Sequence, residues 1–304
     1  MATRTQERRL TFLATALPPI VWVVVFFLAP LAIVWAYSFG QNQGLTDVDI
    51  SGTFANYARA LQPLYLGIFA KSIFVAGLTT LLCLVIGFPV ALAIVFASER
   101  WRAWILLLIM LPFWTNLLIR TYALIAVLRT EGYVNFTLEW LWNHASRLMT
   151  LVGLQPLGDF TPLQLLYSNF AVVLGLVYVH LPFMVLPLYA ALDRLDKSLI
   201  EASLDLGAGH LRTLFSIVVP LALPGIISGI IITFVPALGA YLTPNLLGGP
   251  DSQMIANVIE RQFKQANDWP FGAALSFLLM YATFGVIAFR AYATRGQPAD
   301  GHGI

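Results

Sequence analysis

Long apolar runs separated by short polar stretches form the main pattern along this chain. A helix needs about 20 mostly apolar residues to cross the hydrocarbon core of a membrane. Six runs meet this length, namely Leu17–Phe39, Ser72–Ala97, Ala103–Leu128, Leu165–Leu192, Ile217–Tyr241 and Phe271–Tyr292. The pattern therefore predicts an all-α fold, a polytopic membrane helix bundle with six transmembrane helices.

Composition points to the same class of protein. Of the 304 residues, 59% are hydrophobic and 11% are charged, whereas a soluble domain has about 25% charged residues. The first apolar run exceeds the roughly 7–15 residues of a cleaved signal peptide, so we expect it to be retained as a helix. The net charge of +2 gives no reason to expect a nucleic-acid partner, and the single Cys83 is most simply a packing residue.

The distribution of basic residues predicts the orientation of the bundle. Ten of the 17 Lys and Arg residues fall in short segments that six spans place on one face: Arg4, Arg8, Arg9, Arg100, Arg102, Arg194, Lys197, Arg212, Arg290 and Arg295. The positive-inside rule assigns that face to the cytoplasm, so both termini are expected to be cytoplasmic. The predicted domains are an N-terminal tail (1–16), a transmembrane domain (17–292) with a cytoplasmic loop (193–216), and a C-terminal tail (293–304).

One connection on the opposite face is apolar enough to resemble a seventh span. This segment, Tyr133–Leu154, carries Glu139, His144 and Arg147, and charges inside a membrane are costly and rare. Its apolar residues oppose its polar ones, which is typical of a helix lying in the membrane interface. The apolar set is Phe136, Trp140, Leu141 and Leu148, and the polar set is Asn135, Glu139, Asn143 and Arg147.

Proline and glycine residues interrupt several of the predicted spans. The prolines are Pro89, Pro112, Pro182, Pro187 and Pro236. A proline frees backbone carbonyls, which is tolerated where protein or a water-filled cavity satisfies them. Gly225 and Gly229, four residues apart, allow close approach of a neighbouring helix. Packing alone explains any one of these sites, but together they favour a bundle that rearranges.

The stretch Asp193–Gly225 is charged although it lies between two apolar runs. Leu195, Leu199, Ala202 and Leu206 recur at helical spacing and share one face. Arg194, Lys197, Glu201 and Asp205 form a neighbouring polar stripe. Gly207 and Gly209 are expected to end the helix. The pattern predicts an amphipathic helix followed by a turn, and a helix bound to lipid headgroups would fit it equally well.

Motifs for chemistry are missing from the sequence. It contains no G-x-x-x-x-G-K-[ST] phosphate loop and no H-E-x-x-H motif. It also contains no G-x-S-x-G serine motif. His180, beside Pro182, is more typical of a packed histidine than of a ligand. We therefore expect no enzyme activity, no metal site and no cofactor in this chain, so that transport energy comes from a gradient or from a partner.

The charged stretch resembles a known signature. Glu201-Ala202-Ser203, then Gly207, then Ile217 and Pro220 are similar to the E-A-A-x-x-x-G-(x9)-I-x-L-P signature of permease subunits of binding-protein-dependent ABC importers. Ser203 and Val219 depart from that signature. Further blocks look like the spermidine/putrescine permeases of the PotB/PotH type. These blocks are Leu111–Ala123, Leu181–Leu192, Tyr241–Pro250 and Met254–Ile259.

The resemblance implies a coupling role for the 193–216 loop. In such importers the loop docks on a cytoplasmic ABC ATPase dimer, which binds the ATP. Leu195, Leu199 and Leu206 would pack on the ATPase, while Glu201 would reach its polar or basic groups. Gly207 would permit a chain reversal that a side chain would obstruct. The implied coupling residues are Glu201, Ala202, Ser203, Asp205, Gly207 and Pro220.

The resemblance also implies further partners and a location. They are a second homologous permease, which completes the pathway, a periplasmic or extracytoplasmic solute-binding protein, and membrane lipid. The implied location is the bacterial cytoplasmic (inner) membrane, as a multi-pass protein.

The transported solute is expected to be a polyamine, which aromatic faces suit as a flexible cation. The candidate pathway residues are Trp114, Asn116, Tyr122, Tyr178 and Tyr241, and packing or interface anchoring would explain each aromatic as well. Arg120 would repel a cation if it faced the path. Extracytoplasmic acids could guide the cation or contact the binding protein: Glu131, Asp159, Asp251 and Asp268. The alternatives are another small solute, a gradient-driven secondary transporter, and a non-transporting scaffold or sensor.

Overall fold

The computed structural model describes residues 15–44, 47–153, 155 and 157–294, with side chains described up to residue 285. The chain forms two compact units. The first combines residues 1–66 with 258–304, and the second consists of residues 67–257. Of the predicted tails, 1–16 and 293–304, the structure describes residues 15, 16, 293 and 294, and these are helical.

Four helices of the described residues are long and apolar enough to cross a membrane. They are Thr15–Tyr37, α4 (Pro63–Phe96), α8 (Asn169–Leu192) and His210–Leu238. The first contains η1 (Val24–Leu28) and α2 (Ala29–Tyr37), and the last contains α10 (His210–Thr213), η3 (Leu214–Val218) and α11 (Val219–Leu238). A shorter apolar stretch, Trp269–Gly285, opens α14 (Trp269–Thr294). The all-α membrane fold is confirmed, whereas the number of six spans and the side of the termini stay predictions.

The third predicted span, Ala103–Leu128, is not one continuous helix. It consists of α5 (Glu99–Met110), a 3-10 turn η2 (Leu111–Trp114) and α6 (Leu117–Leu128). The chain bends by 98° between Glu99–Trp114 and Leu117–Leu151. Pro112 cannot donate a backbone hydrogen bond, and Asn116 starts a new helix by accepting from the N–H of Leu118 at 2.8 Å. The interruption expected at Pro112 is therefore a full break.

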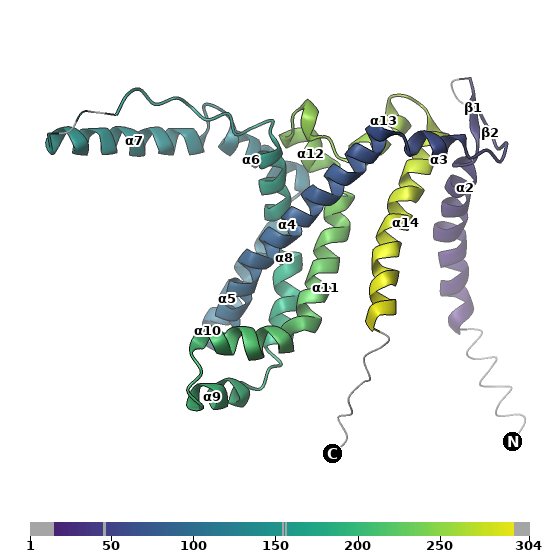
Figure 1. Ribbon diagram of the computed structural model, residues 1–304. Coiled ribbons are helices and arrows are strands. Elements are labelled where there is room, and N and C mark those ends of the chain that lie inside the picture. The colour runs from purple at the N-terminus through teal and green to yellow at the C-terminus, as the bar shows by residue number, and fades with distance from the viewer. Residues whose placement is uncertain (1–14, 45–46, 154, 156, 295–304) are drawn as a thin grey trace, which may run out of the picture. The chain divides into compact units, whose positions relative to one another are not determined.

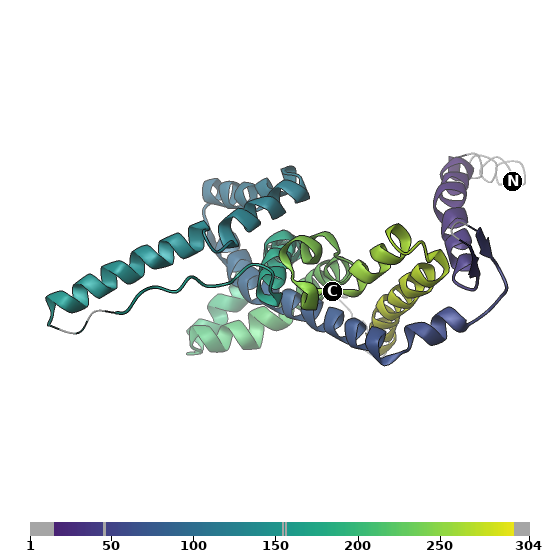
Figure 2. The same cartoon turned by 90° about the horizontal axis from the view of Figure 1, so that it is seen from above.

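The segment expected to lie in the interface is helix α7 (Tyr133–Leu151), which projects from the remainder of its unit in Figures 1 and 2. The chain then returns alongside it. Buried Asn135 joins the two, because its amide donates to the carbonyl of Leu163 and accepts from its N–H, both at 2.9 Å. Phe136, Trp140 and Leu148 are exposed. The helix is amphipathic as predicted, and its place in the membrane interface stays a prediction.

The core of the second unit lies where α4, α8 and α11 pack together. Cys83, Met184, Leu188 and Ala222 are fully buried there. Gly225 and Gly229 make this packing possible. A Cβ atom at Gly225 would lie 2.8 Å from the carbonyl oxygen of Pro187, and one at Gly229 would lie 2.7 Å from Sδ of Met184. The predicted close approach at these glycines is confirmed, and buried Cys83 is the packing residue expected.

Short helices complete the second unit beyond α11. They are α12 (Leu242–Leu247), η4 (Pro250–Ser252) and the start of α13 (Ile255–Lys264). The start of α13 is tied to α4, because Ser72 Oγ accepts from the N–H of Ile255 at 2.8 Å. Asn257 donates to the carbonyl of Tyr241 at 2.8 Å. This polar bracing holds one face of α4 against the connection that follows α11.

The first unit packs α2 and α14 beside a small hairpin. Strands β1 (Gln41–Gln43) and β2 (Asp47–Asp49) pair antiparallel, and α3 (Ala55–Ala60) follows. Trp35 donates from Nε1 to the hydroxyl of Tyr281 at 2.9 Å, which joins α2 to α14. Arg59 pairs with Asp268 at 2.7 Å. The charge of Asp268, one of the acidic residues that could guide a cation, is therefore compensated within its own unit.

Candidate functional site

The 193–216 loop begins at a point where Arg102 joins three segments. Arg102 Nη1 lies 2.9 Å from a carboxylate oxygen of Asp193, the residue that ends α8. Its Nη2 donates to the carbonyl of Val95, near the end of α4, at 2.9 Å. Because Arg102 itself lies in the first turns of α5, one guanidinium group fixes the start of the loop relative to two other helices.

Helix α9 (Lys197–Asp205) starts at a side-chain cap. The carboxylate of Asp196 accepts from the N–H of Ser198 at 3.0 Å. This backbone hydrogen bond is the main cause that lowers the pKa of Asp196 below its usual value. An acceptor at this position satisfies one of the N–H groups that a helix leaves free at its start. The predicted helix is thereby confirmed, with its start set by Asp196.

The end of α9 is a turn built around Gly207. The N–H of Gly207 bonds to the carbonyl of Leu204 at 2.9 Å, and that of Ala208 bonds to the carbonyl of Ser203 at 3.1 Å. This pair of bonds is the Schellman arrangement, which needs a left-handed residue. Gly207 supplies it with φ +83°, and a Cβ atom there would meet nothing within 4 Å. The predicted reversal therefore needs glycine for its backbone angle, and not for the space that a side chain would occupy.

A hydroxyl pair joins the two arms of the loop. Ser203 Oγ and Thr213 Oγ1 lie 3.0 Å apart, so α9 is fastened to α10. Thr213 is 3% exposed. Ser203 is also the position where the sequence departs from the second alanine of the signature. The departure thus adds a hydrogen bond that alanine cannot make.

The apolar side of the loop is divided between the core and the surface. Leu195 and Ile200 pack against the core cluster of α4, α8 and α11. Leu199, Leu206, Leu211 and Phe215 are exposed, and Leu206 is 89% exposed. The three leucines expected to pack on a partner therefore do not form one surface. Leu195 is used within the chain, and Leu211 and Phe215 extend the exposed patch instead.

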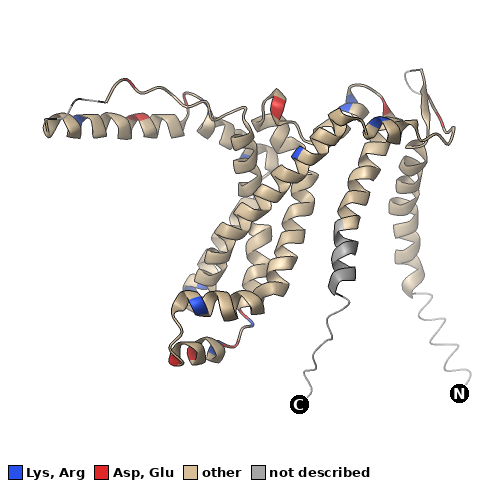
Figure 3. Cartoon of the chain, viewed as in Figure 1, with Lys and Arg blue, Asp and Glu red and all other residues tan. Residues whose placement is uncertain are grey.

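Acidic residues border this patch. Glu201 and Asp205 lie on α9, are exposed and have no ion pair among the described residues; the acidic residues of α9 are red in Figure 3. Ala202 lies beside them and is also exposed. We define the docking face as Leu199, Leu206, Leu211 and Phe215 together with Glu201 and Asp205. It offers apolar side chains from α9, α10 and η3 and negative charge from α9.

Pro220 marks the point where the loop joins the long helix. It stands at the start of α11, directly after the π-helical turn η3. The N–H of Val219 bonds to the carbonyl of Leu214, five residues earlier. A proline removes one donor and its ring crowds the carbonyl four residues back, and a widened turn accommodates both effects. The helix therefore continues from His210 to Leu238 without ending at the proline.

The candidate pathway residues lie on several elements. Trp114 ends η2, Asn116 caps α6, Tyr122 lies on α6, Tyr178 lies on α8, and Tyr241 follows α11. All five are exposed, and Trp114 is 79% exposed. Among the described residues, these five do not gather on one element. The side-chain oxygen of Asn116 is already used by the cap, which leaves its NH2 group for other contacts.

Arg120 belongs to an aromatic cluster near the break of the third span. Its guanidinium carbon lies 6.0 Å from the ring centre of Phe113. Phe113 and Phe183 meet edge to face at 4.7 Å. His180 is buried beside Phe183 and bonds through Nδ1 to the carbonyl of Leu176 at 2.8 Å. This satisfied histidine is as expected, and the cluster holds Arg120 against an aromatic ring.

Sequence reasoning missed two of these features. In the sequence Arg102 is one of the basic residues of one face, and nothing there points to Asp193 as its partner. Ser203 was visible as a departure from the signature. Thr213, a second hydroxyl at the far end of the turn, was the available signal for the pair.

Comparisons with known proteins give consistent results. A family model described as "Binding-protein-dependent transport system inner membrane component" matches residues 83–294. The spermidine/putrescine transport system permease protein PotB of Escherichia coli is 40% identical over 258 residues, which cover 85% of this chain and 88% of that protein. The inner membrane ABC transporter permease protein YdcU of the same organism is 31% identical over 271 residues, covering 86% and 83%.

Solved structures share the fold. A chain of a bacterial ABC transporter involved in the import of the acidic polysaccharide alginate matches with a TM-score of 0.73 and 17% identity, over 97% of this chain and 98% of that chain. A chain of the bacterial alginate transporter in complex with a periplasmic protein bound to an alginate pentasaccharide matches with a TM-score of 0.70, over 96% of each chain. At such low identity the likeness concerns the fold alone.

Proposed function

Because the chain belongs to the family of binding-protein-dependent transport system inner membrane components, we propose that it is the permease subunit of an ATP-driven importer and forms half of a pathway for a polyamine. The family expected from the sequence is confirmed. The polyamine is proposed because of the 40% identity to PotB across 85% of the chain. The alternative within the same architecture is another small solute.

The observation that carries the proposed coupling role is the docking face. Exposed Leu199, Leu206, Leu211 and Phe215 would pack in an apolar groove of a cytoplasmic ATPase subunit. Glu201 and Asp205 have no ion pair among the described residues and would meet basic groups there. Contact of this kind combines apolar burial with charge complementarity, which fixes the orientation of docking.

Internal contacts of the loop would transmit the movement of the ATPase. Leu195 and Ile200 pack against the core, Arg102 holds Asp193, and Ser203 holds Thr213. A force applied to the docking face therefore reaches α8 through Asp193 and α11 through the helix that begins at His210. Closure of two ATPase subunits would bring two such loops together and turn the bundles from inward-open to outward-open, where a solute-binding protein delivers the solute.

A second, homologous permease would complete the pathway. Trp114, Tyr122, Tyr178 and Tyr241 are exposed in this chain, as expected of residues that line one half of a path between two subunits. Their ring faces suit a polyamine cation. Asn116 offers a polar group beside them. Arg120 lies 6.0 Å from the ring centre of Phe113 and would set a limit on where the cation passes.

A gradient-driven transporter is the competing function. Such proteins normally carry an ionisable pair inside the membrane. The ion pairs found among the described residues are Arg59–Asp268, Arg102–Asp193 and Lys264–Glu260. Arg102 and Asp193 lie at the ends of predicted spans, and the other two pairs lie in the connections between spans. The ATP-driven mechanism is therefore favoured.

Co-purification tests the coupling role. A tagged chain in mild detergent should retain its ATPase subunit, and Glu201→Lys should weaken retention and abolish uptake. Glu139→Lys is the matched control, because Glu139 is an exposed acid on α7. Equal retention and uptake in Glu201→Lys and the wild type would contradict the proposal.

A binding measurement tests the identity of the solute. The affinity of the cognate binding protein is measured for spermidine, putrescine and an anionic solute, and a preference for the anion would exclude a polyamine.

A further inference from the structure

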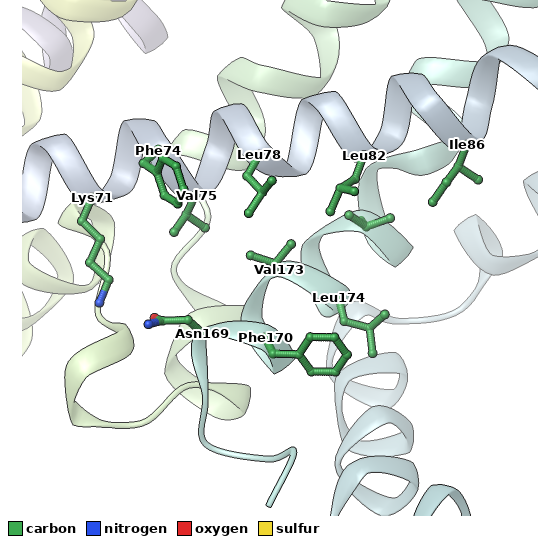
Figure 4. A pocket seen from close by; sticks show the side chains of 11 residues that line it. Lys71, Phe74, Val75, Leu78, Leu82, Ile86, Asn169, Phe170, Val173 and Leu174 are labelled. Carbon is green, nitrogen blue, oxygen red and sulfur yellow. The ribbon is translucent and has the colours of Figure 1, made fainter. Parts of the chain in front are cut away.

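A groove of about 380 Å³ runs between α4 and α8. Phe74, Leu78 and Leu82 lie along one face of α4 and form one wall. Phe170 and Val173 from the first turns of α8 form the other wall, as Figure 4 shows. The neighbouring face of α4 is occupied, because Ser72 bonds to Ile255 and Cys83 is buried in the core. The groove is thus separate from the packed faces of α4.

Polar atoms gather at one end of the groove. Lys71 and Asn169 are the polar residues among those that line it, and their side chains turn toward each other in Figure 4. The ammonium group of Lys71 makes no hydrogen bond or ion pair with another described residue. A cation at the end of an apolar channel is complementary to a molecule with an anionic head and an apolar tail.

The depth of Lys71 in the membrane agrees with this chemistry. The charged turn Ser98–Arg102 follows the end of α4 and places Phe96 near one membrane surface. From Phe96 to Lys71 the helix rises about 38 Å at about 1.5 Å per residue. A bilayer has a core of about 30 Å and a total thickness of about 40–45 Å. At the average tilt of about 20° this rise corresponds to about 36 Å along the membrane normal, so Lys71 would reach the headgroup layer of the opposite leaflet and the apolar wall below it would lie in the hydrocarbon.

The length of the groove fits a lipid chain. From Phe74 to Ile86 the wall is about 18 Å long, close to the roughly 15 Å of one leaflet of the hydrocarbon core. An extended acyl chain can lie along a wall of this length, with a charged headgroup at the end that Lys71 and Asn169 form.

We propose that this groove is a binding site for one anionic phospholipid. Its phosphate accepts hydrogen bonds from the Lys71 ammonium group and the Asn169 amide, and one acyl chain lies along Leu78 and Leu82. The phosphate comes from a lipid and not from free phosphate, because the remainder of the groove is apolar and lies at hydrocarbon depth. The bound lipid fills the space where α4 and α8 separate above their packed core.

Native mass spectrometry of the purified protein tests the headgroup contact. The probes are phosphatidylglycerol and phosphatidylcholine, added in equal amounts. The wild type should retain one phosphatidylglycerol in preference, and Lys71→Ala should weaken that retention roughly tenfold, the loss expected for a charge-assisted hydrogen bond. Lys264→Ala is the matched control, because Lys264 pairs with Glu260 outside the groove. Equal retention by both variants and the wild type would overturn the proposal.

Cross-linking tests what occupies the apolar wall. A benzophenone attached to Leu78→Cys should capture phospholipid enriched in phosphatidylglycerol. Leu81→Cys is exposed on α4 outside the groove and should capture lipid without that enrichment. Native Cys83 is fully buried and does not compete for the label. Capture of a polypeptide at position 78, or the same lipid ratio at both positions, would exclude the lipid site.

Discussion

The hydroxyl groups of Ser203 and Thr213 lie 3.0 Å apart and join α9 to α10 across the turn at Gly207. Because Thr213 is 3% exposed, its hydroxyl has little access to water. Ser203→Ala, which restores the alanine of the family signature, should therefore leave a buried hydroxyl unpaired. We expect a loss of about 1 kcal/mol, seen as roughly fivefold faster amide hydrogen exchange in α9.

Two further variants make this test specific. Ser216→Ala is the control, because Ser216 lies in the same loop, is exposed and makes no side-chain hydrogen bond with another described residue. Adding Thr213→Val to Ser203→Ala should recover part of the loss, since the unpaired hydroxyl is removed. If the amide hydrogens of α9 exchange equally slowly in Ser203→Ala and in Ser216→Ala, the Ser203–Thr213 hydrogen bond does not stabilise the loop.

The guanidinium group of Arg102 should matter more for transport than for folding. Arg102→Ala removes the contacts to Asp193 and to the carbonyl of Val95. A half-exposed ion pair contributes about 1 kcal/mol or less, so the protein should still fold. We expect uptake per ATP hydrolysed to fall several-fold, measured in proteoliposomes, because the loop is no longer fixed to α4 and α5. Arg100→Ala, in the same turn but exposed, should behave as the wild type; matching defects in both variants would argue against a specific role.

Gly207 should tolerate asparagine better than alanine. Its φ of +83° costs a residue with a Cβ atom about 1–2 kcal/mol, and asparagine adopts this region more readily than other residues do. Nothing within 4 Å blocks a side chain, so size is not the limit. Retention of the ATPase in detergent should decrease in the order Gly207, Gly207→Asn, Gly207→Ala. Gly209→Ala, at φ −70° in open space, should have no effect, and an equal loss there would refute the conformational explanation.

Leu206 should act in docking without supporting the fold. It is 89% exposed, so Leu206→Asp should leave the thermal stability of the isolated permease unchanged. It should weaken retention of the ATPase at least tenfold, because a charge replaces an apolar contact in a buried interface. Leu151→Asp is the matched control, since Leu151 is 82% exposed at the end of α7. A similar loss of retention in the control would mean that the effect is not local to the docking face.

The sequence predicts the elements better than their partners. The pattern around Leu199 and Ala202 correctly indicates a helix, and Gly207 correctly indicates its end, but Leu195 precedes α9 and Leu206 is its C-cap. Periodicity cannot separate Leu195, which packs on the core, from Leu206, which is exposed, because burial depends on where α4 and α8 lie. Pro112 shows where the third span is interrupted. The bend itself depends on Asn116, whose cap begins a second helix.

The site is predictable only in its local part. Glu201, Gly207 and Pro220 stand out because their spacing matches a signature within one stretch. Arg102 and Asp193 meet through the folding of distant segments, and folding likewise brings Lys71 and Asn169 to the lining of one groove. Such pairs leave no trace in the spacing of one sequence. The pathway aromatics remain a prediction, because a second subunit would enclose them.

The break between η2 and α6 has a mechanical consequence. Thr115 and Asn116 are extended, with ψ angles of 145° and 138°, and neither belongs to a helix. The hydroxyl of Thr115 donates to the carbonyl of Pro112, and the side-chain oxygen of Asn116 accepts from the N–H of Leu118. Free backbone groups at the end of η2 and at the start of α6 thus find partners without a bond across the break. Asn116 stays with α6, because its carbonyl also accepts from the N–H of Arg120 at 3.1 Å. Rotation about Thr115 would therefore change the 98° angle without breaking a helical hydrogen bond. We expect this residue to act as a hinge inside an apolar segment, at which α5 and α6 can turn relative to each other.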